Sequence, residues 1–350
     1  MNIIDRQLLE KANEEASYNL YIYLAHMTSV QKGETLEEIV SKLEQIDMTS
    51  ERNKYRLQIL RNTIDQNTIL SQSTISNLTL NKGGLTACSF TKPNGGVSVI
   101  FRGTGSGEWI DNGEGLSGIP EENTYITYDR FGQEKRTIIK KDYATDQQTE
   151  ALNWFNRIAA ENAWRNNSIT VSGHSKGGNK AQFIAIHSDL VKDCFSFDGQ
   201  GFSPEALKLL KERHGDKYYE RREKIMSLSA CNDYVNVLGE RIMPEDNIYY
   251  FESFAGFHYL EAMLDRNGVL RPQCRQGKLS QYIETVSAAL MNMKPIIRQN
   301  AALGIMNIFQ KYLGEGTPVN SDNVSLEKTV AGLGIAIGSI LHSFRSFKDM

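Results

Sequence analysis

A glycine-flanked serine stands between a strand pattern and a helix pattern near the middle of this 350-residue chain. The β-branched run at residues 169–172 leads into Gly-His-Ser-Lys-Gly-Gly at residues 173–178, and residues 179–188 then follow a helical pattern. G-x-S-x-G in this context predicts a sharp strand-to-helix turn that presents Ser175 above a sheet, because side chains at the flanking positions would collide with neighbouring backbone. The alternative is a tight glycine turn with an inert serine. Either interpretation requires a sheet with a helix after this strand.

Strand candidates on both sides of this turn predict a mostly parallel sheet. Two β-rich runs at residues 85–90 and 97–102 flank a Pro-Asn-Gly-Gly turn signal, which indicates a pair of neighbouring strands. Further strand candidates lie at residues 168–172, 194–197, 225–230 and 248–251, each separated by enough chain for a helix or a crossover. This alternation predicts an α/β fold whose central sheet is covered by helices.

Helical patterns precede and follow the predicted sheet. Residues 1–82 are poor in Gly and Pro, and Thr-Leu-Glu-Glu at 35–38 has capping-box spacing, so we expect a helical N-terminal extension. Residues 83–265 are expected to form the core, with an insertion at 105–145 that serves as a lid or a hairpin around Gly132. Residues 266–350 are expected to form a helical C-terminal extension without strands. Its apolar run at 330–341 is shorter than the roughly 20 residues that span a bilayer, and it therefore predicts a buried helix.

The composition is that of an ordinary soluble globular protein. Lys and Arg number 39 against 42 Asp and Glu, a formal net charge of −3 that gives no support for a nucleic-acid partner. The first residues are acidic where a cleavable export signal has a basic start, so we expect a cytoplasmic protein, with export by a signal-independent route as the alternative. The four cysteines form no C-x-x-C pair, which favours free thiols in a reducing compartment and predicts no metal site.

A serine hydroxyl is a weak nucleophile, so Ser175 needs a base, usually a histidine that a carboxylate orients. In folds with this turn the chain order is serine, acid, histidine. His214 lies in a charged helical pattern typical of a solvated face, and His342 lies in the terminal helical pattern. His258 follows the last predicted strand through a glycine-containing loop. We therefore predict His258 as the base.

Two aspartates compete for the role of the orienting acid. Asp233 follows the predicted strand 225–230, whereas Asp198 follows the strand before it, in Ser-Phe-Asp-Gly-Gln-Gly at 196–201. The position after the penultimate strand matches the expected order better, which favours Asp233. Asp198 would then cap a turn or shape the substrate pocket, as an Asp followed by Gly often does.

An oxyanion hole requires two backbone amides, one from the residue after the nucleophile and one from a loop after an early strand. The amides of Lys176 and Thr104 fit these positions. The glycines at 103, 105 and 107 also resemble a phosphate-binding loop, but they lack G-x-G-x-x-G spacing and a Walker lysine. The Lys176 amine is poorly placed to act as a base, so we expect it to be solvated or to steer substrate. Trp109 is either a core anchor or part of a lid over the site.

These blocks together resemble class 3 lipases of the α/β-hydrolase superfamily. The similar stretches are Val-Ile-Phe-Arg-Gly-Thr at 99–104 with Trp109 nearby, the residues 171–178 around Ser175, and Asn-Asp-Tyr-Val at 232–235. Lys176 and the Ser-Phe-Asp-Gly-Gln-Gly-Phe at 196–202 look most similar to the bacterial Mbeg1-like branch. The resemblance covers about residues 83–265. The sequence differs from lipases at Lys176, where lipases commonly have an apolar residue, and in the short interval between the acid and the base.

The resemblance implies an α/β-hydrolase fold with Ser175 as nucleophile, Asp233 as acid, His258 as base, and the amides of Thr104 and Lys176 as the oxyanion hole. From motifs and resemblance we expect a serine esterase or lipase that cleaves a small-molecule or lipid carboxylic ester through an acyl-enzyme, without a metal or organic cofactor. One alternative is a phospholipase A1-type effector whose helical flanks make peripheral contact with membranes. Another is a catalytically silent hydrolase fold that serves as a binding or scaffold protein.

Overall fold

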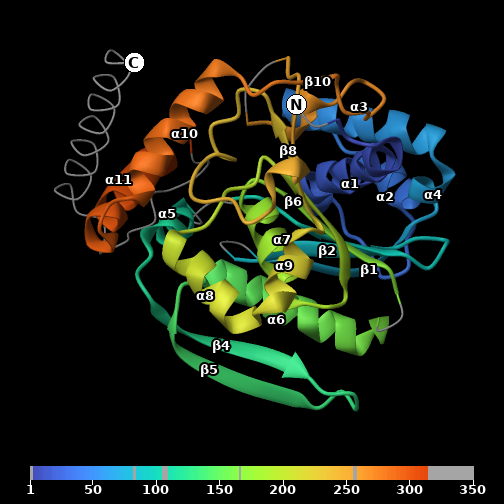
Figure 1. The fold of residues 1–350 in the computed structure, drawn as a ribbon. Helices are drawn as coiled ribbons and strands as arrows, with labels where there is room; N and C mark the ends of the chain where they lie inside the picture. Colours follow the sequence, from blue (N-terminus) through green and yellow to red (C-terminus); the bar gives the residue numbers. More distant parts are fainter. Residues whose placement is uncertain (1–2, 82–83, 105–108, 165–166, 255–257, 314–350) are drawn as a thin grey trace.

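The computed structural model describes residues 3–81, 84–104, 109–164, 167–254 and 258–313. An eight-stranded sheet in the order β1-β2-β3-β6-β7-β8-β9-β10 lies at its centre (Figure 1). The strands of this sheet are β1 (Thr74–Leu80), β2 (Thr86–Thr91), β3 (Val97–Phe101), β6 (Ile169–His174), β7 (Val191–Phe197), β8 (Ile225–Ala230), β9 (Ile248–Phe251) and β10 (Gln273–Cys274). The helices are α1 (Arg6–Leu24), α2 (Leu36–Leu43), α3 (Glu51–Gln66), α4 (Thr68–Ser71), α5 (Trp109–Ser117), α6 (Asp146–Glu161), α7 (Lys176–His187), α8 (Pro204–His214), α9 (Asp216–Arg222), α10 (Lys278–Met291) and α11 (Pro295–Leu313).

The middle of the sheet is parallel. Strands β3, β6, β7, β8 and β9 pair in parallel, while β1, β2 and β10 join in antiparallel fashion at the two edges. Carboxyl ends of parallel strands meet at one edge of a sheet, so the loops after these five strands lie near one another. Those loops carry the residues singled out above, which are Thr104, Ser175, Asp198, Asp233 and His258. This arrangement is the predicted α/β-hydrolase fold.

Two strands lie outside the range in which the sequence pattern placed the sheet. Strand β1 falls within residues 1–82, and the short β10 follows residue 266, where no strand was expected. Both are edge strands. Only Ile75 of β1 is buried, so β1 lacks the apolar run that marks an interior strand. The paired strands β2 and β3 and the turn between them confirm the other prediction for this region.

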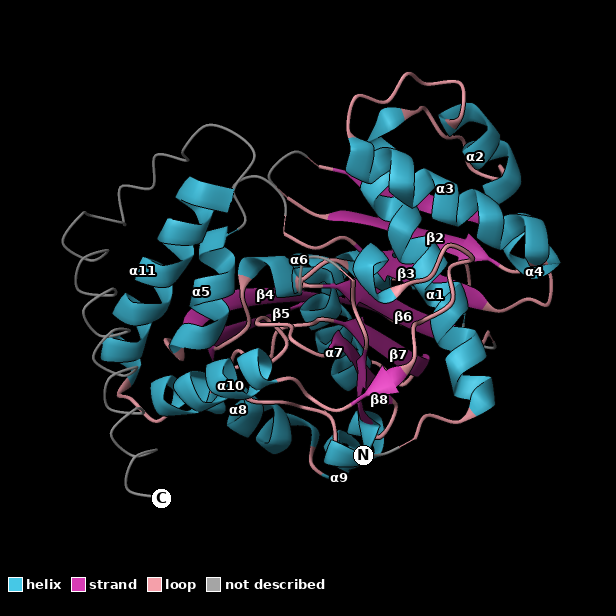
Figure 2. Ribbon diagram, turned by 90° about the horizontal axis from the view of Figure 1, so that it is seen from above, coloured by secondary structure: helices cyan, strands magenta, loops and turns pink. Residues whose placement is uncertain are grey.

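Helices cover both faces of the sheet (Figure 2). Helices α1, α2 and α3 pack on one face, where Ile100 of β3 joins their apolar side chains. Helices α6, α7 and α8 pack on the other face, against Val99 and Phe101 of the same strand. Neighbouring residues of β3 thus face opposite layers, as the two-residue period of a strand requires. The sheet is buried between the two helical layers.

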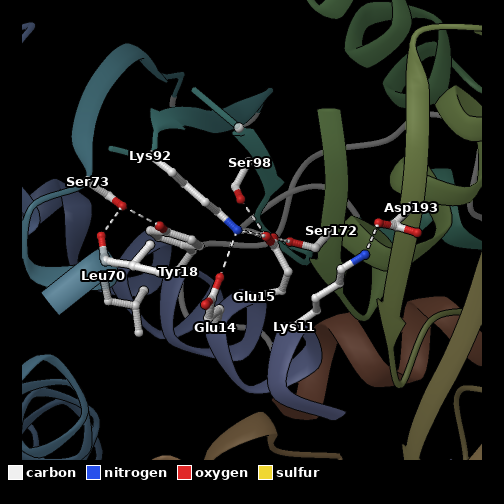
Figure 3. A network of polar contacts seen from close by, with 12 residues as sticks. Lys11, Glu14, Glu15, Tyr18, Leu70, Ser73, Lys92, Ser98, Ser172 and Asp193 are labelled. Carbon is white, nitrogen blue, oxygen red and sulfur yellow. Dashed lines mark hydrogen bonds and ion pairs between the residues drawn. The ribbon is translucent and has the colours of Figure 1, made fainter. Parts of the chain in front are cut away.

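Helix α1 contacts the sheet through polar side chains as well as apolar ones. Glu15 is fully buried and accepts hydrogen bonds from Ser98 of β3 and Ser172 of β6, the latter at 2.8 Å (Figure 3). Asn19, one turn further along α1, donates to Ser172 at 2.9 Å. Burial is the main cause that raises the pKa of Glu15 above its ordinary value. These bonds fix α1 against β6 three residues before Ser175.

The predicted insertion contains a hairpin and a helix. Strands β4 (Glu121–Tyr128) and β5 (Glu134–Asp142) form a separate two-stranded antiparallel sheet around Gly132, as expected for a hairpin. Asn153 of α6 bonds to the backbone of β4, so the hairpin lies against α6. Helix α5 instead packs against α10 and α11 through an apolar cluster that includes Leu116 and Met306.

The predicted apolar helix at 330–341 and His342 lie outside the described residues. Among the residues that the structure does describe, no helix combines the length and apolar character needed to cross a bilayer. The four cysteines are free, with Cys88 and Cys194 buried and the other two half-buried. The division of the chain at residues 82 and 265 stays a prediction.

Candidate active site

The turn between β6 and α7 has the strained backbone expected of a nucleophile elbow. Ser175 adopts φ 60° and ψ −128°, a region that residues other than glycine rarely occupy. A Cβ atom at Gly177 would overlap the carbonyl oxygen of Phe101, and one at Gly173 would overlap the backbone of Gly177. The flanking glycines are therefore required by close approach of three backbone segments, as the sequence predicted.

Ser175, His258 and Asp233 lie in one line of hydrogen bonds. The Oγ atom of Ser175 is 2.8 Å from Nε2 of His258, and Nδ1 of His258 is 2.7 Å from Oδ1 of Asp233. The second carboxylate oxygen of Asp233 accepts from the backbone amides of Val235 at 3.1 Å and Asn236 at 2.6 Å. Asp233 is fully buried, so these donors replace the water that its charge would otherwise bind. This geometry can activate a serine hydroxyl.

The competing histidine His214 lies elsewhere. It ends α8 and packs against His187 with ring centroids 4.8 Å apart. Burial and then the guanidinium groups of Arg221 and Arg213 lower the pKa of His214 to about 4. The expectation of a solvated face for His214 was wrong, because His214 is half-buried against Arg221 of α9 and His187 of α7.

Asp198, the competing acid, faces a different histidine. It is fully buried with φ 48°, and its Oδ1 accepts from the amide of Ala230 at 2.8 Å. Its Oδ2 lies 3.6 Å from Nε2 of His174, the residue before the nucleophile. Burial and then the nearby Asp233 raise the pKa of Asp198 well above its ordinary value. Asp198 thus lies beside the Ser175–His258–Asp233 line rather than in it.

His174 links this region to the N-terminal helix. Its Nδ1 is 2.8 Å from the hydroxyl of Tyr23 in α1, and its ring lies 4.9 Å from that of His258. Burial and then His258 lower the pKa of His174 well below its ordinary value, so the ring is neutral. Tyr23 was not predicted from the sequence, because no local pattern relates residue 23 to the elbow.

One group among the described residues has the composition of a metal site. Ligand-type atoms of His174, Asp198 and His258 lie within 4.8 Å of one another. Both ring nitrogens of His258 are already within hydrogen-bond distance of Ser175 and Asp233. A cation bound by all three would therefore compete with the arrangement just described.

The two residues predicted to supply oxyanion-hole amides adjoin, in sequence, residues at the Ser175 turn. Lys176 is the first residue of α7, so its amide has no partner within the helix. Thr104 follows Gly103, at which a Cβ atom would be only 3.1 Å from Cβ of Ser175. The hydroxyl of Thr104 accepts a hydrogen bond from Asn112 of α5 at 2.8 Å, which fixes this loop to α5.

The side chain of Lys176 is buried rather than solvated. Its Nζ pairs with Oδ2 of Asp111 at 2.5 Å, and the exposed fraction of the lysine side chain is 0%. Asp111 also accepts from the Thr145 hydroxyl at 2.9 Å and the Gln147 amide at 3.1 Å. The prediction of a solvated Lys176 side chain was wrong, because the turn aims this side chain at Asp111 of α5. The acidic residue two positions after Trp109 was the only sequence signal for this partner.

A small cavity of about 20 Å³ lies over Ser175. Its wall is formed by residues of the predicted core and by one residue of the predicted C-terminal extension, namely Trp109, Asn112, Ser175, Gln200, Tyr234, Val235, Leu238, His258 and Met306. Trp109 therefore lines the site, and it packs against the apolar cluster that contains Met306 of α11. This volume is close to the smallest that holds one water molecule.

A larger groove of about 390 Å³ borders α2 and α3 and contains neither Ser175 nor His258.

Comparison with known proteins agrees with the resemblance. Residues 138–228 match the family model described as Mbeg1-like, a segment that contains Ser175 and Asp198 and ends within β8. Among solved structures, the chain is similar to the M37 lipase crystal structure at 14% identity, covering 67% of this chain and 70% of that one with a TM-score of 0.31. No curated protein matches the chain. The match over residues 138–228 confirms the similarity to Mbeg1-like proteins that the motifs predicted.

Proposed function

We propose that this protein is a serine hydrolase of the esterase or lipase type, which cleaves carboxylic esters through an acyl-enzyme. The observation that carries the proposal is the pair of short contacts of His258, 2.8 Å to Ser175 and 2.7 Å to Asp233. The strained backbone of Ser175 supports it, since such strain persists where the surrounding structure demands it and is common at reactive residues.

In the acylation step, Nε2 of His258 accepts the hydroxyl proton as Oγ of Ser175 bonds to the ester carbonyl carbon. The resulting oxyanion is held by the amides of Thr104 and Lys176, each of which contributes about a hundredfold to a thousandfold in turnover in comparable sites. The carbon–oxygen bond to the alcohol then breaks, and His258 gives its proton to the departing alkoxide. The acyl group remains on Ser175.

In the deacylation step, His258 removes a proton from water, whose oxygen attacks the acyl carbon. Collapse of the second oxyanion breaks the bond to Oγ, and the proton returns to Ser175 as the carboxylic acid leaves. The amides of Val235 and Asn236 and the His258 ring hold the Asp233 carboxyl group in place during both steps. It stabilises the cationic form that His258 takes in each step.

The cavity constrains how a substrate reaches Ser175. A volume of about 20 Å³ cannot contain an acyl chain, so α5 or α11 has to move for an ester to bind. The apolar side chains of Trp109, Leu238 and Met306 line this space and would contact an acyl group. These residues favour an apolar acyl chain over a charged one.

A fluorophosphonate probe tests the proposal directly, because it phosphonylates activated serines. Wild-type protein should label and the Ser175→Ala variant should not, whereas the matched control Ser71→Ala in α4 should label like the wild type. Hydrolysis of p-nitrophenyl esters of increasing chain length, run with the same variants, then identifies the preferred acyl length. Folded wild-type protein that neither labels nor hydrolyses any ester would overturn the proposal and favour a scaffold protein.

Defined vesicles separate a soluble esterase from a phospholipase. Release of fatty acid from phosphatidylcholine vesicles, lost in Ser175→Ala, would assign membrane lipids as substrates. Cleavage of short soluble esters alone would restrict the protein to esterase activity.

A further inference from the structure

Two buried carboxyl groups lie close together at this edge of the sheet, but their surroundings differ. Asp233 receives hydrogen bonds from two backbone amides and contacts His258. Asp198 receives one, from Ala230, and its Oδ2 has no hydrogen-bond partner although it is buried. The nearest candidate partner is Nε2 of His174, which is also buried without a hydrogen bond.

Charge balance decides which of these groups is ionised. Two buried carboxylates this close repel each other, so one of them retains its proton in most such pairs. Asp233 has the donors that stabilise an anion, and Asp198 lacks them. Transfer of the Asp198 proton to His174 would make His174 a cation. His258 and the guanidinium groups of Arg52 and Arg56 in α3 disfavour a positive charge on His174. Arg56 lies 4.4 Å above the ring of Tyr23, the other neighbour of His174.

We propose that Asp198 is a protonated carboxylic acid that donates to Nε2 of His174, and that this neutral pair is a positioning element for His258. The atoms are 3.6 Å apart, and a rotation of the carboxyl group brings its proton toward the ring nitrogen. His174 then carries its own proton on Nδ1 and donates it to the hydroxyl of Tyr23. Asp198 at Nε2 and Tyr23 at Nδ1 therefore both favour the tautomer of His174 that carries its proton on Nδ1.

A neutral Asp198–His174 pair places no extra charge beside His258. The His174 ring packs against the His258 ring at 4.9 Å and restricts its orientation. A charged His174 would oppose the cation that His258 becomes during the reaction, and an ionised Asp198 would compete with Asp233 for it. Asp198 thus acts through His174. This role rests on the proposed function of Ser175 and His258, whereas the protonation of Asp198 does not.

Replacement by asparagine separates a neutral acid from an anion. Asparagine has the size of aspartic acid, tolerates the φ of 48° at this position, and its Nδ2 can donate to His174. Asp198→Asn should therefore keep the fluorophosphonate labelling rate and its pH profile within about threefold of the wild type. Asp233→Asn, the matched variant of the other carboxyl, should lose roughly 10⁴ because the base adopts the wrong tautomer. Asp198→Ala should lose more than Asp198→Asn, because it leaves Nε2 of His174 unpaired.

Difference infrared spectroscopy tests the proton itself and needs no activity. At pH 7 the wild-type spectrum minus that of Asp198→Asn should contain the carbonyl band of a protonated carboxylic acid, and no such band should appear in the difference for Asp233→Asn. A carboxylate band in its place, or a hundredfold loss of labelling in folded Asp198→Asn, would overturn the proposal. If no variant labels but the acid band is present, the proposed function fails while the protonated Asp198 stands.

Discussion

The buried pair of Lys176 and Asp111 provides a quantitative test of how the nucleophile turn is attached to α5. The perturbation is Asp111→Asn, which keeps the side-chain shape and an acceptor oxygen but removes the negative charge. The Lys176 side chain, of which 0% is exposed, then lacks a negatively charged partner. A charge that is buried without its partner is among the most costly defects in a folded protein.

The expected cost of Asp111→Asn is about 3 kcal/mol, the lower end of the usual range of roughly 3–5 kcal/mol for a broken buried pair. The lower end applies because Asp111 itself is 11% exposed, so water can approach the lysine at that side. Lys176→Met should cost less, about 1–2 kcal/mol, because the abandoned carboxylate keeps its bonds from Thr145 and Gln147. The double variant carries no charge here and should cost about 2 kcal/mol less than the sum of the single variants.

Urea unfolding of the wild type, both single variants and the double variant measures this coupling. The slope of free energy against urea concentration has to agree among the four proteins for the comparison to hold. Costs that add within about 0.5 kcal/mol, or a cost of Asp111→Asn below about 1 kcal/mol, would refute the assignment of a strong buried pair. The coupling concerns stability, so it is measured whether or not the protein is active.

Three further predictions concern other parts of the site. Gly177→Ala should abolish fluorophosphonate labelling and destabilise the protein by more than about 3 kcal/mol, because the added Cβ would overlap the backbone of Phe101. The control Gly132→Ala, at the open tip of the hairpin, should cost only about 1 kcal/mol and should still label. Equal costs for the two variants would contradict the close approach at Gly177. Burial raises the pKa of Glu15 above its ordinary value of 4.5, so its stabilising contribution is complete below about pH 4.5 and is lost as pH rises through the raised pKa. In urea unfolding, the stability of the wild type relative to Glu15→Gln should therefore decline as pH rises above about 4.5, and a constant difference would contradict it. Met306→Ala should enlarge the cavity over Ser175 and raise kcat/KM for long-chain p-nitrophenyl esters relative to acetate, and an unchanged ratio would exclude Met306 from the acyl path.

The residues around the elbow were predictable because their chemistry is local in the sequence. The glycines at 173 and 177 and the strand before them are adjacent in the chain, and the parallel sheet brings the ends of β8 and β9 to the same edge. Asp233 and His258 follow from that rule, since each comes after a strand that the apolar pattern reveals. Sequence reasoning preferred Asp233 to Asp198 on position alone, and the hydrogen bond to His258 goes to Asp233.

The contacts missed from the sequence join segments that are far apart in the chain. Tyr23 meets His174 across about 150 residues, and Asp111 meets Lys176 across about 65, so no spacing rule connects either pair. Lys176 was expected in solvent because its amine is poorly placed to act as a base for Ser175. The partner was present in the sequence as Asp111, but only the packing of α5 over α7 brings it there.

Helices from both ends of the described chain contact the region around Ser175, and this indicates what the flanking helices do. Glu15, Asn19 and Tyr23 recur every four residues along α1, so they form one stripe on that helix and meet Ser172 and His174, which alternate on one face of β6. Met306 of α11 lines the cavity over Ser175. Each buried polar group costs free energy unless it is paired, so a helix that only covers apolar surface would not have such a polar stripe. The stripe on α1 pairs with the polar side chains of β6. The N-terminal helix is therefore part of the structure that holds His174 behind Ser175, and residues 83–265 alone would present that face of β6 with its polar groups unpaired.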